Sequence, residues 1–140
     1  MTNTLTLSRS FPYSPEKVFS KYSDPVTLAR WWGPNGFTNT FHSFDFREGG
    51  KWVFTMSDGN NNYLNEHIFH KIEKNHIIME HIVEPIFTLE VIFEAIWENE
   101  TKMTWISTFA NAEFLAQMTD FLIEKNNENF DRLAAELNNF

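Results

Sequence analysis

The last quarter of the chain carries the most regular pattern of apolar and polar positions. When successive residues are placed about 100° apart, residues 113–137 collect their large apolar side chains on one half of the circle. These are Phe114, Leu115, Met118, Phe121, Leu122, Phe130, Leu133 and Leu137. The stripe predicts a long amphipathic helix, which Lys125, Asn126 and Asn129 interrupt at mid-length. The two asparagines either face an apolar interior, where they need a hydrogen-bond partner, or become exposed where the helix leaves the sheet.

The N-terminal part predicts one strand followed by two short helices. Apolar and polar residues alternate over residues 4–11, which is typical of an edge strand. A capping residue followed by proline then occurs twice, at Ser14-Pro15 and at Asp24-Pro25. Each pair supplies an N-cap and a proline at the first helical position, so each predicts a helix start. The Gly-Pro-Asn-Gly run at 33–36 ends the second helix.

From Phe37 onward the period changes to two, which is typical of strands. Turn residues divide this region into six expected strands, near residues 37–47, 51–57, 63–73, 76–83, 87–97 and 102–109. The connections are too short for a parallel crossover, so neighbouring strands are expected to be antiparallel.

Alternation within these strands predicts which face is buried. Phe87 to Trp97 is the clearest strand, with every second residue apolar. In 63–73, Leu64, Ile68 and Ile72 share a face with Glu66 and His70, so that strand is expected to point two polar groups inward. The strand at 37–47 carries phenylalanines on both parities, which predicts a bulge or a second buried face.

The predicted order of elements is β-α-α-β₆-α, which indicates an α+β fold. A strongly curved antiparallel sheet of seven strands buries one face on the long C-terminal helix, and the two short helices close one end. Residues 1–140 are expected to form a single domain, because the chain is short and one core suffices. A sheet curved around a helix need not touch it everywhere, and the space that is left predicts a ligand cavity.

Composition restricts the partners of this domain. The formal charge of −8 argues against nucleic acid and anionic membrane, which both need a basic face. No apolar run approaches the ~20 residues of a membrane span, and we expect no signal peptide. The chain has no cysteine, which fits a reducing cytoplasm. With 15 Phe and 5 Trp, bulky rings must fill much of the core, and they favour a cavity.

Two motifs resemble one known family. They are Ala29-Arg30-Trp31-Trp32-Gly33-Pro34 and Asp45-Phe46-Arg47-Glu48-Gly49-Gly50-Lys51-Trp52, with Phe130-Asp131-Arg132-Leu133-Ala134 near the end. Together they are similar to the C-terminal domain of the heat-shock-protein-90 ATPase activator, in the superfamily of START domains and polyketide cyclases. The resemblance implies the helix-grip fold. It implies little about function, because that fold serves carriers, cyclases and co-chaperones. Many relatives carry Gly-Trp in the final helix where this chain has Lys125-Asn126.

The first functional hypothesis is the binding of a small hydrophobic ligand, aromatic, acyl or polyketide-like, between the sheet and the C-terminal helix. Three polar groups are expected to orient the ligand: Glu66, His70 and Asn129. The expected apolar lining is Trp32, Phe41, Trp52, Phe54, Phe93, Trp105, Met118, Phe121 and Leu122. Of the adjacent Trp31 and Trp32, one is expected to pack and the other to line the entrance, because they point about 100° apart on a helix.

Two alternatives use the same domain differently. A cyclase- or hydrolase-type enzyme would use Glu66 as a general base with His70, without a metal or nucleotide cofactor. A protein-interaction module would bind a chaperone, or a second copy of the chain, through outward isoleucines at 92, 96 and 106.

The remaining polar motifs are expected to be structural. His67 and His70 should point to opposite faces of their strand, as should His76 and His81 of theirs, so we expect no metal site. Residues 45 and 47 are expected to form an ion pair, with capture of a ligand carboxylate by Arg47 as the alternative. Gly49 and Gly50 are expected to serve turn geometry.

Overall fold

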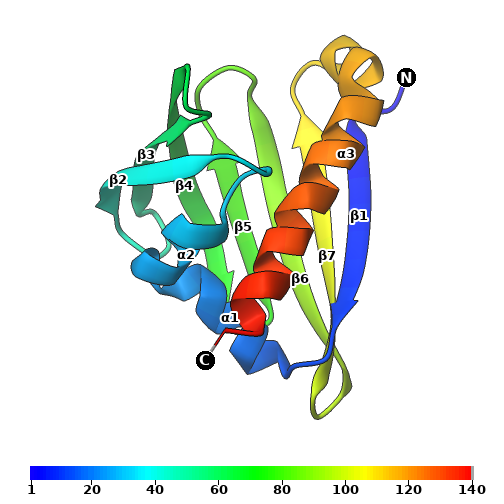
Figure 1. Cartoon of the computed structure of the whole chain (residues 1–140). Coiled ribbons are helices and arrows are strands. Elements are labelled where there is room, and N and C mark those ends of the chain that lie inside the picture. The colour runs from blue at the N-terminus through cyan, green and yellow to red at the C-terminus, as the bar shows by residue number, and fades with distance from the viewer. Residues whose placement is uncertain (140) are drawn as a thin grey trace.

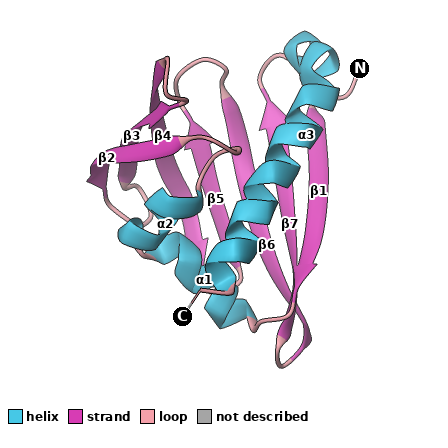
Figure 2. Cartoon of the chain, in the orientation of Figure 1, coloured by secondary structure: helices cyan, strands magenta, loops and turns pink. Residues whose placement is uncertain are grey.

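Seven strands form one antiparallel sheet, and three helices lie on the same side of it (Figure 1, Figure 2). The computed structural model describes residues 1–139. The first elements are β1 (Thr4–Phe11), α1 (Pro15–Ser23), α2 (Pro25–Trp31), β2 (Thr38–Phe44) and β3 (Lys51–Ser57). They are followed by β4 (Asn62–Glu73), β5 (His76–His81), β6 (Phe87–Trp97), β7 (Glu100–Phe109) and α3 (Ala112–Leu137). The predicted order of elements is confirmed.

The two short helices begin at the capping residues that the sequence predicted. The Ser14 hydroxyl accepts a hydrogen bond from the backbone N–H of Lys17 at 3.2 Å. The Asp24 carboxylate accepts one from the N–H of Val26 at 3.1 Å. Asn111 caps α3, because its side-chain oxygen accepts from the backbone N–H groups of Glu113 and Phe114. In each case the cap satisfies backbone donors that the helix itself leaves unpaired.

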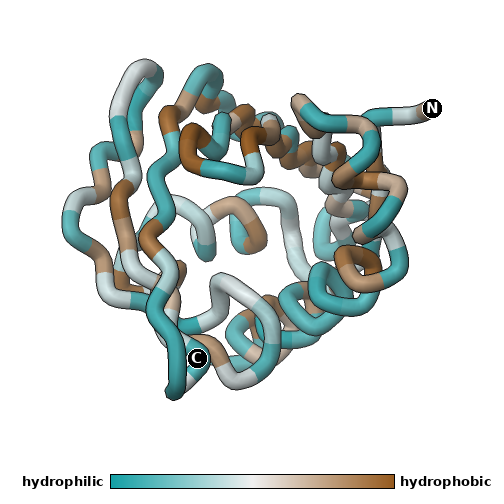
Figure 3. Tube along the Cα trace, turned by 90° about the horizontal axis from the view of Figure 1, so that it is seen from above, coloured by the Kyte–Doolittle hydropathy of each residue, from teal (hydrophilic) through white to brown (hydrophobic). Residues whose placement is uncertain are grey.

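The sheet order is β1-β7-β6-β5-β4-β3-β2, so β1 and β2 are its two edges. The chain passes from one edge to the other through α1 and α2, which lie across one end of the sheet. Seen from above, the strands form a curved wall around the helices (Figure 3). The long helix α3 runs beside β1 and β7, and its C-terminal half meets α1 and α2.

The end of the molecule near α1 and α2 is filled solidly. Trp31, Phe130 and Leu133 are fully buried there, and Tyr22 packs edge-to-face against both Trp31 and Phe93. The Tyr22 hydroxyl accepts a hydrogen bond from Trp105 Nε1 at 3.0 Å, so this buried polar group is paired. Burial raises the pKa of Tyr22 far above its usual value, against the smaller opposing effect of the Trp105 hydrogen bond.

Polar side chains of α3 hold the turn that follows α2. The guanidinium of Arg132 donates to five backbone carbonyls at 2.8–3.1 Å, those of residues 30, 32, 33, 34 and 37. Glu136 accepts a two-pronged contact from Arg30, with a shortest N–O distance of 2.6 Å. At the sheet edge, Arg9 of β1 pairs with Asp131 at 2.6 Å. These contacts fix α3 relative to α2 and β1.

The prediction for the buried face of β4 is wrong. Asn65, His67 and Phe69 point inward, opposite Phe54, Trp52 and Met79 of the neighbouring strands. The register shifts between Phe69 and Lys71, and beyond that bulge Ile72 packs against the core. Because a bulge reverses the parity of a strand, Ile72 faces inward while Leu64 and Ile68 lie on the outer side.

The bulge that the sequence suggested for the second strand is present. The register between β2 and β3 shifts between Phe41 and Ser43. Beyond β2, the chain turns tightly at Gly49-Gly50. A Cβ atom on Gly50 would lie 2.0 Å from the carbonyl oxygen of Asp45, so only glycine fits there. The pairing of Gly50 O with the N–H of Phe69, at 2.9 Å, ties this turn to β4.

Candidate ligand-binding cavity

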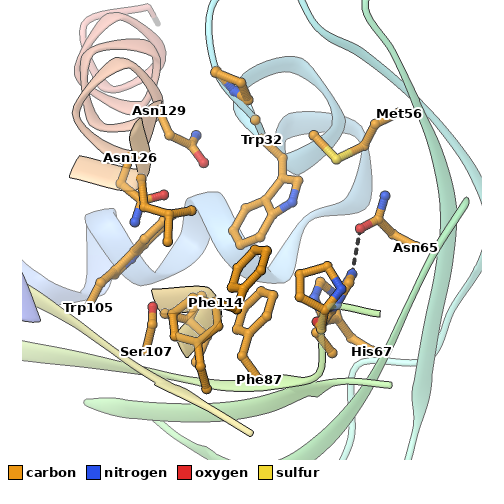
Figure 4. Close-up of a pocket in the computed structure, with 17 residues that line it drawn as sticks. Trp32, Met56, Asn65, His67, Phe87, Trp105, Ser107, Phe114, Asn126 and Asn129 are labelled. Atoms are coloured by element: carbon orange, nitrogen blue, oxygen red, sulfur yellow. Dashed lines mark hydrogen bonds between the residues drawn. The ribbon is translucent and has the colours of Figure 1, made fainter. Parts of the chain in front are cut away.

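A cavity of about 260 Å³ lies between the sheet and α3, which contributes residues between Phe114 and Asn129 to its wall. Its walls come from β3 to β7, from α3, and from the turn after α2 (Figure 4). The aromatic core meets this space at Trp32 and Trp105, and the rings of Phe87, Phe109 and Phe114 border it without filling it. The predicted space between sheet and helix is therefore present.

Apolar side chains make up most of the wall. The aromatic ones are Trp32, Phe87, Trp105, Phe109 and Phe114, and the aliphatic ones include Met56, Leu89 and Leu122. Figure 4 shows the rings of Trp32, Phe87 and Phe114 close to one another in the middle of the site. Trp32 also contacts Trp105 with ring centroids 5.5 Å apart, so one wall of the cavity is a rigid indole pair.

Six polar side chains reach the cavity, in two groups. Asn65, His67 and His81 come from β4 and β5, and Ser107, Asn126 and Asn129 from β7 and α3. In Figure 4 the labelled members of the two groups lie on opposite sides of Trp32 and Phe114. Among the described residues that line the cavity, none is Asp, Glu, Lys or Arg. The site therefore suits an uncharged, mostly apolar molecule, since an ion would have to leave water without a partner charge.

His67 is the most deeply buried polar residue of the wall, with 2% of its surface exposed. Its ring lies 5.0 Å from that of Trp52 and 5.1 Å from that of His81, between centroids. Its Nδ1 atom has no hydrogen-bond partner among the described residues. Burial lowers the pKa of His67 well below its usual value, and the neighbouring His81 lowers it further, so the ring is neutral at pH 7.

His81 is held by two contacts. Its Nδ1 lies 2.7 Å from the carbonyl oxygen of Pro85, and its Nε2 lies 2.7 Å from Oδ1 of Asn65. Burial lowers the pKa of His81, while hydrogen bonds to the backbone at Pro85 and Val83 raise it. The Pro85 carbonyl only accepts, so Nδ1 carries the proton of the neutral ring and Nε2 is left as an acceptor. The Asn65 amide keeps its orientation because its Nδ2 donates to the Tyr63 carbonyl at 3.1 Å, so the contact between Nε2 and Oδ1 is made without a donated proton.

The two asparagines of the helix stripe face the interior. Asn129 is buried and donates through Nδ2 to the Trp31 carbonyl at 2.8 Å, while Asn126 is half-buried. Both line the cavity, which decides between the two alternatives left open by the sequence. Lys125 turns away and pairs with Glu128 at 3.4 Å. The polar gap in the stripe therefore marks the part of α3 that borders empty space rather than side chains.

Four of the expected site residues line the cavity: Trp32, Trp105, Leu122 and Asn129. Four others lie in the solid core instead, namely Phe41, Trp52, Phe54 and Phe93. Trp52 and Phe54 stack with ring centroids 4.2 Å apart, and Phe41 packs on both. Phe93 packs against Tyr22 and Phe19 beside α1. Their positions are a correction to the expected lining, because neighbouring rings already fill the space in front of each.

Two expected residues of α3 lie beside the cavity rather than in its wall. Phe121 is 51% exposed, and the Lys125 ammonium lies 5.7 Å from its ring. Met118 is half-buried. Leu122, Asn126 and Asn129 face the cavity, and Phe121 lies about 100° around the helix from Leu122, on the flank of that face. Met118 shares the face of Leu122 one turn earlier but does not border the cavity.

Glu66 and His70 do not line the cavity. Contrary to the expectation, neither side chain is placed to orient a ligand there or to act on it as an acid or base. Glu66 alternates with the inward His67 and lies opposite Val53 on the outer side of the sheet. His70 is exposed and contacts the Glu80 carboxylate at 2.8 Å. The bulge after Phe69 is the cause, because the expectation assumed one unbroken alternation along β4.

Several residues of the site were missed by the sequence analysis. His67 and His81 were considered only with the other histidines of their own strands, whereas they are direct partners across β4 and β5. Phe87 and Phe109, which are partners across β6 and β7, bring two more rings together at the same end. These neighbours could have been predicted from the register of the hairpins, if the odd-numbered residues of β4 had been taken as the buried ones.

The other polar motifs have structural roles. Asp45 and Arg47 form an exposed ion pair of 2.8 Å, and neither borders the cavity. Of the adjacent tryptophans, Trp31 packs in the core and donates to the Lys21 carbonyl at 2.9 Å, while Trp32 lines the cavity. Within residues 1–139 no group of three or more His, Asp or Glu side chains is placed to hold a metal ion. No helix of that range is both long and apolar enough to cross a bilayer.

A curved seven-stranded antiparallel sheet, two short helices and a long C-terminal helix beside a cavity define a helix-grip domain. Residues 12–138 match the family described as Activator of Hsp90 ATPase homolog 1-like protein, and the chain belongs to this family. The family expected from the sequence motifs is thereby confirmed. No protein with a curated description matches the chain in sequence.

Solved structures of bacterial proteins resemble this one over nearly their whole length. A protein from Arthrobacter aurescens, solved by NMR, is 26% identical with a TM-score of 0.88, over 98% of this chain and 87% of its own. A protein from Mycobacterium smegmatis is also 26% identical, with a TM-score of 0.84 over 98% of this chain and 92% of its own. The AHSA1 protein from Silicibacter pomeroyi, at 20% identity, has a TM-score of 0.75 over 96% of each chain.

Proposed function

We propose that this protein binds a small, neutral, ring-shaped molecule in the cavity between the sheet and α3. The observation that carries the proposal is a space of about 260 Å³ with five aromatic side chains and no charged side chain among its described lining residues. We place this function in the cytoplasm, because a chain without cysteine suits a reducing compartment.

The size of the cavity favours one or two rings over a long chain. Benzene fits an apolar cavity of about 150 Å³, whereas drug-sized ligands take about 300–1,000 Å³. The space here lies between those values. A long acyl chain would also bring a carboxylate or an ester head, and the described wall offers no cation to a carboxylate.

The shape of the wall supports a flat ligand. Trp32, Phe87 and Phe114 present rings to the same space, and rings of a ligand gain about 0.5–1.5 kcal/mol per aromatic contact beyond the burial of area. The wall is also held in place before any ligand arrives, because Arg132 and Asn129 tie the Trp32 turn to α3. A ligand therefore has little side-chain freedom to remove when it binds.

Titration with naphthalene, followed by quenching of tryptophan fluorescence, tests the proposal, because Trp32 and Trp105 border the cavity. Two neighbouring residues of α3 provide matched variants. Leu122→Trp places a large ring inside the cavity and is expected to abolish saturable quenching. Phe121→Trp places the same ring on the exposed flank and is expected to leave the affinity unchanged. Equal effects of the two variants, or the absence of saturable binding by naphthalene and related one- and two-ring compounds, contradict the proposal.

Catalysis is a weaker use of the same cavity, because Glu66 and His70, the groups expected to perform it, lie outside the wall. Contact with a chaperone has one observation in its favour. Ile96 and Trp97, at the end of β6, are 45% and 72% exposed. If this surface binds heat-shock protein 90, the chain stimulates the chaperone's ATPase and Trp97→Ser removes the stimulation. No stimulation by the wild-type chain excludes it.

A further inference from the structure

The most deeply buried polar side chain of the cavity wall, that of His67, makes no hydrogen bond to the other described residues. Nδ1 of His67 is completely enclosed without a partner, so the other ring nitrogen, Nε2, is the one that a ligand in the adjoining cavity can reach. On the opposite side, Asn129 already donates to the Trp31 carbonyl. A buried nitrogen without a partner destabilises the protein, so a ligand that supplies the partner binds more tightly than one that does not. A ligand can therefore gain by carrying a polar group at the His67 end, which is the more deeply buried side, while Ser107 and Asn126 offer polar groups on the other side.

The polar group that fits is uncharged. The rings around His67 are those of Trp32, Trp52, Phe54 and His81, so the imidazole sits in an apolar setting that disfavours charge. His81 points its two nitrogens at Pro85 and Asn65 and does not supply a partner to His67. A neutral imidazole offers a strong acceptor nitrogen, which pairs with a hydroxyl donor.

From this geometry we infer that the His67 end of the cavity is a subsite for a hydroxyl group, so that the ligand is a neutral compound of one or two rings bearing a phenol- or enol-type O–H. The hydroxyl donates to a ring nitrogen of His67 while the rings lie against Trp32, Phe87 and Phe114. This inference rests on the proposed function, because it assigns a ligand chemistry to the same cavity. The rings supply affinity and the O–H supplies orientation.

Three naphthalene compounds separate the two contributions. 2-Naphthol carries the donor, 2-methoxynaphthalene has the oxygen without a donor, and naphthalene has neither. Isothermal titration of the wild-type protein is expected to show 2-naphthol binding at least about tenfold more tightly than either of the others, equal to about 1.4 kcal/mol. The anion 2-naphthoate is expected not to bind, because the described wall contains no cation.

A pair of histidine variants tests the residue itself. His67→Phe keeps a ring of similar shape and removes both nitrogens, so the preference for 2-naphthol over 2-methoxynaphthalene should fall to about onefold while naphthalene still binds. His70→Phe makes the same change on the exposed outer side of β4 and should keep the wild-type preference. If His67→Phe does not fold, ¹⁵N NMR of the wild-type imidazoles replaces it, with a shift of the His67 nitrogens expected on addition of 2-naphthol and not of naphthalene.

The outcomes distinguish the two claims. If none of the naphthalene compounds binds saturably, the proposed function fails and this inference fails with it. If all three bind with equal affinity, or if His67→Phe keeps the preference for the hydroxyl, the cavity function stands and the hydroxyl subsite is refuted. Tight binding of 2-naphthoate also refutes it, because the ligand is then an anion.

Discussion

Replacement of Arg132 is the most informative perturbation of this fold, because this side chain makes more hydrogen bonds to the turn between α2 and β2 than any other described residue. Its two terminal nitrogens donate to five backbone carbonyls, including those of Trp32, Gly33 and Pro34. Those three residues also line the cavity. Arg132→Met keeps most of the length and the apolar stem and removes every donor.

The magnitude follows from the number of donors. Two guanidinium nitrogens carry four N–H groups, and each hydrogen bond is worth about 1 kcal/mol net when buried. The side chain is half-buried, so water replaces part of the loss, and we expect a destabilisation of about 2–3 kcal/mol. At roughly 3 °C per kcal/mol for a domain of this size, the Tm should fall by about 6–9 °C. Arg132→Lys should recover little, because an ammonium cannot reach this spread of carbonyls.

Urea unfolding followed by tryptophan fluorescence measures the change, with the midpoint read at constant m value. Arg47→Met is the matched control, because Arg47 is exposed and forms only a surface pair with Asp45. It should change the free energy of unfolding by less than about 0.5 kcal/mol. The reasoning is refuted if Arg132→Met unfolds at the wild-type midpoint, or if Arg47→Met is equally destabilised.

Three further predictions concern a turn, a helix face and a histidine pair. Gly50→Ala should lower the free energy of unfolding by about 1–3 kcal/mol, read from the urea midpoint, since its Cβ would lie 2.0 Å from the Asp45 oxygen; an unchanged midpoint contradicts this. Phe121→Ser should leave the urea midpoint within about 0.5 kcal/mol of wild type, because the ring is exposed, and a larger loss places Phe121 in the core. Burial lowers the pKa of His67 and His81 in the folded protein, so below about pH 6.5 the unfolded chain binds more protons than the folded one. The free energy of unfolding should therefore fall as the pH drops below that value, by up to about 1.4 kcal/mol per pH unit for each histidine. His67→Gln should flatten that slope, and a wild-type slope in the variant would refute the assignment.

Much of the fold could be predicted because local signals agreed with one another. Ser14-Pro15 and Asp24-Pro25 start helices at the expected residues, and the apolar stripe of α3 buries Leu115, Phe130 and Leu133. Short turns leave an antiparallel meander as the simple way to connect β2 to β7. These signals act over a few residues, so a single sequence contains them.

The cavity wall was harder to predict, because it depends on register between strands. The histidines 67 and 81 lie together only because β4 pairs with β5 residue for residue at that point, before the bulge at Phe69. The core positions of Trp52 and Phe54 followed correctly from alternation, but alternation does not say whether an inward ring meets another ring or a void. That depends on where the rings of α1, α2 and α3 end, which is a property of the packed molecule.

The helix stripe illustrates the same limit on a smaller scale. Asn126 and Asn129 interrupt an apolar face, and from the sequence alone an exposed and a buried placement were equally consistent with that pattern. The choice depends on Asn129 reaching the Trp31 carbonyl, a partner 98 residues away in the chain.

The most direct test of binding in the cavity is to locate a bound ring within the protein. Intermolecular NOEs between 2-naphthol and the protein, measured with labelled methyl groups, report this position without any substitution. The account predicts NOEs from the naphthol ring to the methyl groups of Met56, Leu89 and Leu122, which border the cavity. NOEs to Ile68, Ile92 and Ile106 on the outer side of the sheet, with none to the three inner residues, would contradict it.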